Sequence, residues 1–181
     1  SRDLEGAGSF AKRADGDVYD STDYKAANYK WILKFHNNTP SPQKNFVFYD
    51  ETVDPRLKFT RIDYSRLMEG NYGIGKQIHT IVKRIILTME DGSTKEIQSE
   101  ADKDGNGLID LTKYGTVVGW RMEMKDDFVL QSGQGINLNS YTSFKDPEKT
   151  RYDENDATKN VYKNTGRVTY KTQSNVAKDQ S

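Results

Sequence analysis

The segment DKDGNGLID, residues 102–110, combines residue types and spacing that suit cation binding. Four oxygen-donating side chains fall at positions one, three, five and nine of a calcium loop: Asp102, Asp104, Asn106 and Asp110. Gly107 stands at the sixth position, where such a loop turns sharply. The twelfth position holds Lys113 in place of the usual bidentate Glu, and the residues before it have the pattern of a strand instead of a helix. Two interpretations remain open, a weak calcium site and a polar hairpin loop without metal.

Other catalytic motifs are incomplete. GNYGIGK, residues 70–76, is superficially similar to a phosphate-binding loop but lacks the rest of either nucleotide-binding signature, so a flexible loop between strands fits it better. His36 and His79 are the only histidines, and neither has a partner at metal-ligand spacing. No GxSxG nucleophile elbow occurs. We therefore do not expect an enzyme that acts on an external substrate.

The charge balance excludes some partners. Lys plus Arg and Asp plus Glu both number 27 in the 181 residues, so the net charge is zero, and no basic block is longer than two residues. Nucleic acids and anionic membranes require a basic face, so neither is an expected partner. The absence of cysteine excludes disulfides, thiolate metal sites and cysteine nucleophiles. No apolar run approaches the roughly 20 residues of a membrane span.

Strands must position the candidate groups, because period-two alternation runs through the chain. In residues 29–36, YKWILKFH, aromatic and aliphatic side chains alternate with mostly polar ones, as in a strand with one buried face. Asp91-Gly92, between two such runs, signals a hairpin. Further runs occur at residues 45–51, 81–89, 95–98, 116–124, 135–144 and 160–172. About eight to ten short strands separated by turn residues predict a β-sandwich or barrel.

Four segments follow one another in a recurring order: GDVYDSTDYKAANYKWILKFHNN, NFVFYDETVDPRLKFTRI, FVLQSGQGINLNSYTSF and KNTGRVTYKT. This order resembles the immunoglobulin-like stalk modules of Gram-positive cell-wall-anchored adhesins and fimbrial pilins. The resemblance covers roughly residues 10–57 and 128–171. The stretch 60–125 matches less well, and we interpret it as a candidate insertion that carries the Asp102 loop.

The resemblance implies a fold and a division of the chain. The fold would be an all-β, immunoglobulin-like β-sandwich with a central insertion. One sandwich domain would occupy residues 10–172, with flexible segments at residues 1–9 and 173–181.

Many modules of the family that the chain resembles carry a self-formed isopeptide bond between a lysine of the first strand and an asparagine of the last. Carried over by position, the resemblance implies Lys12 as nucleophile, Asn164 as acceptor and Asp50 as the carboxyl between them. Burial would favour the neutral amine and the neutral acid, so the amine can attack and the acid can move the proton. Lys34 and Glu123 are the alternative lysine and acid, although strand alternation turns Lys34 outward. In the other interpretation, Lys12 is a solvated edge residue, Asp50 a turn residue and Asn164 a hydrogen-bonding residue at a strand end.

The resemblance also implies a role for the chain. It would be a structural stalk module outside the cell, in a cell-wall-anchored surface adhesin, with neighbouring modules as partners. The one candidate cofactor is calcium, which the donor spacing of the Asp102 loop indicates independently of the resemblance. The alternative is a ligand-binding module of the same kind of surface protein, which recognises a host glycan or protein through its loops. The two roles differ in one measurement, because a ligand raises the melting temperature of a binding module.

Overall fold

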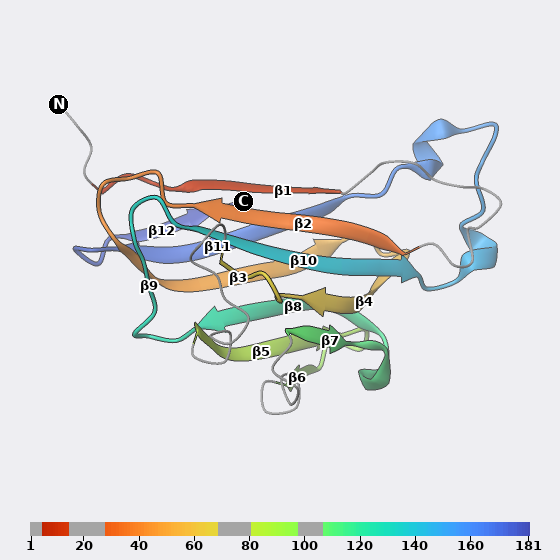
Figure 1. Cartoon of the computed structure of the whole chain (residues 1–181). Helices are drawn as coiled ribbons and strands as arrows, with labels where there is room; N and C mark the ends of the chain where they lie inside the picture. The colour runs from red at the N-terminus through yellow and green to blue at the C-terminus, as the bar shows by residue number, and fades with distance from the viewer. Residues whose placement is uncertain (1–4, 15–27, 69–80, 98–106) are drawn as a thin grey trace.

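Strands form nearly all of the regular structure. The computed structural model describes residues 5–14, 28–68, 81–97 and 107–181. Its strands, labelled in Figure 1, are β1 (Ser9–Ala14), β2 (Tyr29–His36), β3 (Gln43–Val53), β4 (Leu57–Asp63), β5 (Val82–Met89), β6 (Thr94–Glu96), β7 (Leu108–Asp110), β8 (Val117–Met124), β9 (Val129–Leu130), β10 (Gly135–Phe144), β11 (Asn164–Thr172) and β12 (Ala177–Gln180). Short 3-10 helices are η3 (Thr112–Tyr114), η4 (Pro147–Lys149) and η5 (Ala157–Asn160). No helix in these ranges has the length and hydropathy of a membrane span. The predicted all-β class is confirmed.

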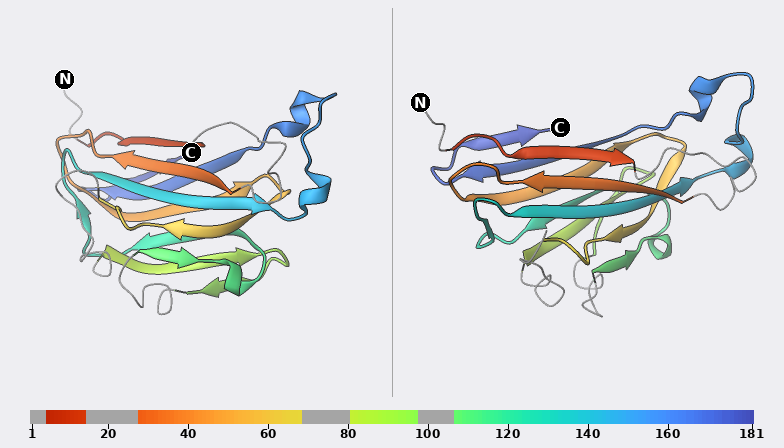
Figure 2. Two further views of the ribbon diagram at one scale, coloured as in Figure 1. Left: turned by 45° about the vertical axis from the view of Figure 1, so that its right-hand side comes forward. Right: turned by 45° about the horizontal axis from the view of Figure 1, so that its top comes forward.

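The strands form two layers that are joined along one side. They follow the order β1-β2-β10-β4-β8-β3-β11-β12, and all of these pairs are antiparallel. Figures 1 and 2 show β1, β2, β10 and β4 in one layer over β8, β3, β11 and β12 in the other. The pair of Phe59 and Val117 joins the layers between β4 and β8. On the opposite side, no ladder among the described strands joins β1 to β11 or β12, so that side is open.

One large hydrophobic core lies between the layers. Leu33 and Phe35 of β2 and Phe46 and Phe48 of β3 are almost fully buried in it. The ring centroids of Phe35 and Phe46 are 5.1 Å apart, and those of Phe35 and Tyr170 are 4.9 Å apart, both edge to face. Because these contacts join strands of different layers, the predicted sandwich is confirmed.

The turn between β5 and β6 follows the hairpin signal of the sequence. Gly92 has φ +86°, in the left-handed region where glycine is favoured. The Asp91 carboxylate accepts hydrogen bonds from the Ser93 N–H at 2.9 Å and the Ser93 hydroxyl at 2.6 Å. The prediction of a hairpin at Asp91-Gly92 is confirmed.

The stretch 60–125, interpreted from the sequence as a candidate insertion, contributes a central strand. β8 pairs with β3 on one side and with β5 on the other. Trp120 and Met122 of β8 are buried in the main core. The described part of this stretch is therefore continuous with the sandwich, because β8 links the layers and contributes side chains to the main core.

Residues 173–181, expected to be a flexible end, contain β12. Asn175 takes φ +66° in the turn before it, and β12 then pairs with β11. The Tyr170 hydroxyl donates to Gln180 Oε1 at 2.5 Å and accepts from the Gly8 N–H at 2.9 Å. These hydrogen bonds anchor the two ends of the described chain to each other. The sequence does not predict this anchoring, because the segment is polar and lacks the apolar alternation of a buried strand.

Arg56, at the turn between β3 and β4, holds the excursion between β10 and β11 that projects at the right of Figure 1. Its guanidinium donates to the two Asp54 carboxylate oxygens at 2.9 and 2.7 Å, and to the carbonyls of Lys159 and Val161 at 2.7 and 2.8 Å. It also lies over Tyr162, 4.1 Å from the ring centroid. Tyr162 packs against a second buried cluster, which comprises Trp31, Leu57 and Phe144. The excursion therefore covers one end of the sandwich.

Replacing Arg56 by lysine should lower the free energy of unfolding by about 1–2 kcal/mol, because an ammonium cannot hold both Asp54 oxygens and reach both carbonyls. Hydrogen bonds from Arg56 also hold the pKa of Asp54 below its ordinary value. A depressed carboxyl pKa contributes stability above the unfolded pKa, and that stability is lost as the pH falls through the folded pKa. The difference between wild type and variant should therefore shrink below about pH 4. Urea unfolding at neutral and acidic pH measures both effects.

Arg151→Lys is the matched control. Arg151 makes an exposed contact with Glu148 at 2.7 Å, three residues away, and such surface pairs contribute less than about 1 kcal/mol. Equal losses in the two variants would contradict a specific role for Arg56.

Candidate functional site

Lys12 lies in β1 with its side chain turned into the sandwich. Lys12 pairs with Leu33 of β2. It follows Phe10 by two residues, so the two side chains share a face of β1, and Phe10 packs against the main core. Only 4% of the Lys12 side chain is exposed. β1 is the end strand on the open side of the sandwich. No described strand therefore lies between this inward lysine and the other layer.

Asp50 lies opposite Lys12, in β3. It continues the inward row of Phe46 and Phe48, and its residue is completely buried. The Lys12 ammonium contacts Oδ1 of Asp50. The Ser140 hydroxyl, from β10 in the first layer, donates to Oδ2 at 3.1 Å. The two oxygens of the carboxyl therefore have different partners.

Asn164 and Gly166 complete the cluster from β11. Asn164 pairs with Val53 of β3, and its side-chain amide is close enough to the Asp50 carboxyl to lower the pKa of that carboxyl. Both polar atoms of this amide are buried, and neither has a hydrogen-bond partner of normal geometry within the described residues. Gly166 leaves the space through which Lys12 passes, because a Cβ there would lie 2.7 Å from Lys12 Cδ. The structure thus brings together the lysine, aspartate and asparagine that the resemblance implied.

Removal from water dominates the electrostatics of this cluster. Burial lowers the pKa of the Lys12 amine and raises the pKa of the Asp50 carboxyl, because it disfavours both charged forms. The ion pair opposes both shifts, and the Ser140 hydroxyl and the Asn164 amide also lower the Asp50 pKa, but burial remains the larger effect. Proton transfer from Lys12 to Asp50 is therefore easier here than in water, and it gives a neutral amine beside a neutral acid.

Aromatic side chains surround the cluster. Lys12 Nζ lies 5.9 Å from the centroid of the Trp31 ring, which is itself buried. The Trp31 indole N–H donates to the Thr142 hydroxyl at 2.8 Å, so it does not compete for Asp50. Trp120 is the β8 partner of Asp50 and is also buried. These rings keep water away from the ion pair.

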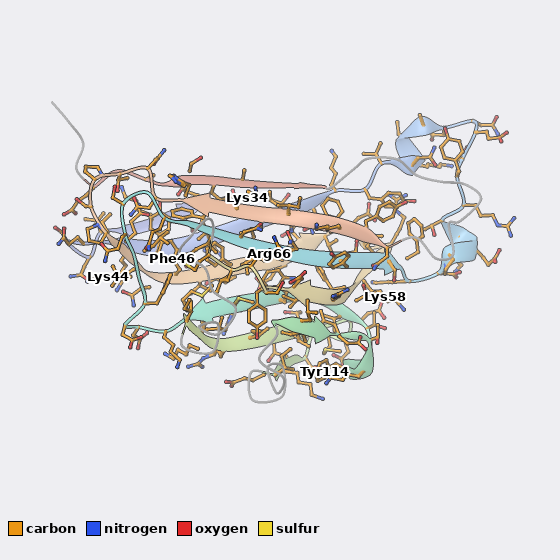
Figure 3. All side chains as sticks on the ribbon, viewed as in Figure 1. Lys34, Lys44, Phe46, Lys58, Arg66 and Tyr114 are labelled. Carbon is orange, nitrogen blue, oxygen red and sulfur yellow. The ribbon has the colours of Figure 1, made fainter. Side chains whose placement is uncertain are left out.

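The alternative lysine and acid lie outside this cluster. Lys34, labelled on β2 in Figure 3, is exposed, as the strand alternation predicts. Glu123 pairs with Arg84 at 2.7 Å and keeps 22% of its side chain exposed. Neither of these two residues contacts Asp50.

Ser140 and Gly166 are the site residues that the sequence reading did not identify as functional. Ser140 falls in the inward row of β10, between Leu138 and Thr142, where an apolar residue is the usual choice. A serine in an apolar row could have indicated a buried polar contact at this position. Gly166 gave no signal, because its importance depends on where the Lys12 side chain lies against β11.

The predicted calcium loop lies mostly outside the described residues. Asp102, Asp104 and Asn106 belong to residues 98–106, which the structure does not describe. Asp110 is described, and its Oδ1 accepts from the Thr112 N–H at 2.9 Å and from the Thr112 hydroxyl at 2.6 Å. Within the described ranges, no three acidic, histidine or cysteine side chains gather as metal ligands. Calcium binding stays a prediction.

No protein-family model matches the chain, and no curated protein sequence matches it. Among solved structures, domains D2 and D3 of the major pilin SpaD from Corynebacterium diphtheriae are similar over 95% of this chain, with 15% identity and a TM-score of 0.48. An Asp-to-Ala variant of BcpA, the major pilin subunit of Bacillus cereus, is similar over 96%, with 13% identity and a TM-score of 0.44. The chain spans 49% of the first structure and 38% of the second. At this similarity neither structure decides the family or the function of the chain.

The buried pair can be tested without any covalent bond, in an Asn164→Ala background. There, Asp50→Ala should lower the free energy of unfolding by about 3–5 kcal/mol, because it leaves the Lys12 ammonium buried without its partner. Replacing both residues together, Lys12→Met with Asp50→Leu, should restore most of the loss, because no charge is then buried. Urea unfolding at neutral pH measures both variants.

Asp179→Ala in the same background is the control. Asp179 pairs with Arg167 at 2.9 Å on the exposed face of β11 and β12, so its loss should cost less than about 1 kcal/mol. If Asp50→Ala costs no more than Asp179→Ala, Lys12 and Asp50 are not a desolvated pair.

Proposed function

We propose that the chain is a structural module of a bacterial surface protein, closed by an amide bond that forms spontaneously between Lys12 Nζ and Asn164 Cγ. One observation carries the proposal: a lysine, an aspartate and an asparagine from three strands converge in the core. Natural cores rarely bury charged groups, because each ion loses several kcal/mol of hydration. A chemical role explains why this core retains them.

The reaction balances with the groups present. The Lys12 ammonium gives a proton to the Asp50 carboxylate, and the neutral amine attacks Asn164 Cγ while the Asp50 acid polarises the amide oxygen. A second proton passes from the attacking nitrogen through Asp50 to Asn164 Nδ2. The Cγ–Nδ2 bond then breaks, and ammonia leaves. Asp50 keeps the remaining proton, which suits a carboxyl whose pKa burial raises.

The proposed bond would close the open side of the sandwich. β1 and β11 belong to different layers, and no ladder among the described strands joins them. Tension applied to the ends of the module would otherwise separate β1 from β2 one hydrogen bond at a time. An amide between Lys12 and Asn164 would carry that load covalently. It would also resist reduction, which suits a chain without cysteine outside the cell.

This role agrees with a stalk module in a cell-wall-anchored adhesin or pilus, whose partners are neighbouring modules. A chemically inert, cross-linked core is what such a module needs. A binding module for a host glycan or protein would instead depend on its loops. Calcium in the Asp102 loop would be an additional stabilising ligand in either role.

The intact mass of the purified wild-type chain tests the proposal. We expect a deficit of one ammonia relative to the sequence, because bond formation expels Asn164 Nδ2. The full mass should return in each of three variants, Lys12→Arg, Asp50→Ala and Asn164→Ala. They remove the nucleophile, the proton carrier and the acceptor, respectively. Lys34→Arg is the matched control on an exposed lysine and should keep the deficit. A wild-type chain of full mass would exclude the cross-link.

The cross-link should also raise the stability of the fold. The bond would join residues near the two ends of the domain and so close a long loop. Its loss in Asn164→Ala should lower the free energy of unfolding by about 4–5 kcal/mol if the loop-entropy model applies. Thermal and urea unfolding of the wild type and Asn164→Ala measure the loss. Asn38→Ala, at an exposed asparagine after β2, controls for the loss of an amide and should change stability little. Equal stabilities of the wild type and Asn164→Ala would contradict a covalent closure.

A further inference from the structure

Two hydroxyl side chains interrupt the apolar inward row of β10. The row runs from Ile136 and Leu138 through Ser140 and Thr142 to Phe144, and every member is buried. A buried hydroxyl costs free energy unless it is hydrogen bonded. Thr142 accepts the Trp31 indole N–H at 2.8 Å, which accounts for one of the two hydroxyls.

Ser140 has a different partner. It is 2% exposed, and its hydroxyl donates to Asp50 Oδ2 at 3.1 Å from the layer opposite β3. The described groups that face the Asp50 carboxyl are therefore Lys12 from β1, the Asn164 amide from β11 and the Ser140 hydroxyl from β10. Ser140 is the member of this set that forms and breaks no bond in the proposed reaction.

We propose that Ser140 is a positioning residue, which holds the Asp50 carboxyl by Oδ2 so that Oδ1 receives and returns the proton of Lys12. This inference rests on the proposed function. A carboxyl that is hydrogen bonded only to its reaction partners can rotate about its Cβ–Cγ bond. The bond from Ser140 fixes the plane of the carboxyl, and it makes Oδ2 the less basic oxygen. The proton is then directed to the oxygen that faces Lys12.

The electrostatic effect of Ser140 agrees with this role. Its hydrogen bond lowers the pKa of Asp50 and so opposes the effect of burial. The hydrogen bond thus favours the carboxylate, which is the form that accepts the proton of Lys12 at the start of the reaction. A carboxyl already protonated by solvent would leave Lys12 as an ammonium, which cannot attack.

The test measures the rate of bond formation in the full chain after cell-free synthesis. A short labelling pulse is followed by quenching in denaturant, and intact mass gives the linked fraction at each time. Ser140→Ala should link about ten- to a hundredfold more slowly than wild type, because the carboxyl is no longer oriented. Ser140→Thr keeps the hydroxyl and should link at close to the wild-type rate. Thr142→Val removes the neighbouring hydroxyl of the same row and should also link at close to the wild-type rate.

The outcomes separate this inference from the proposal on which it rests. A linked wild type, with Ser140→Ala linking at the same rate, would overturn the role of Ser140 and leave the cross-link intact. Equal slowing in Ser140→Ala and Thr142→Val would also overturn it, because general packing of β10 would then explain the effect. A wild type that never links would overturn both. If Ser140→Thr fails to fold, the comparison of Ser140→Ala with Thr142→Val decides.

Discussion

The ion pair of Lys12 and Asp50 is buried in an apolar core, and the surrounding structure is arranged around that burial. Each ion loses several kcal/mol of hydration on transfer from water, and the mutual attraction repays this only with good geometry and further hydrogen bonds. The partners come from separate strands: Lys12 from β1, Asp50 from β3, Ser140 from β10 and Asn164 from β11. A core selected only for stability would place apolar side chains here. The proposed amide bond would account for the four polar groups that this core retains at one point.

The architecture of the sandwich makes this convergence possible. The layers are joined at β4 and β8 and open at β1, so a side chain from β1 can cross the core to β3 and β11. Gly166 leaves the passage for Lys12, and Trp31 and Trp120 exclude water around it. Arg56 and Tyr162 cover the end of the sandwich next to Trp31. The residues that close the core thus also make the surroundings of the Lys12 amine and the Asp50 carboxyl less polar.

The sequence predicts the strands well, because period-two alternation survives in the folded state at residues 29–36 and 135–144. Asp50 was implied by the resemblance alone, and the structure places it in the buried row of Phe46 and Phe48. The pairing order of the strands was not predictable, because β8 contacts both layers through residues distant in sequence. The role of Gly166 and the strand at residues 177–180 were likewise hidden, because both depend on contacts between segments far apart in the chain.

Peptide mapping of the wild-type chain tests the central claim most directly, because it examines the bond itself. Proteolytic digestion followed by tandem mass spectrometry should yield a branched peptide in which Lys12 is joined to Asn164. The separate linear peptides around these two residues should be missing. Recovery of both linear peptides at full mass, with no branched species, would show that Lys12 and Asp50 form only a buried salt bridge. The core would then be a stable sandwich that tolerates the pair, without the covalent closure proposed for it.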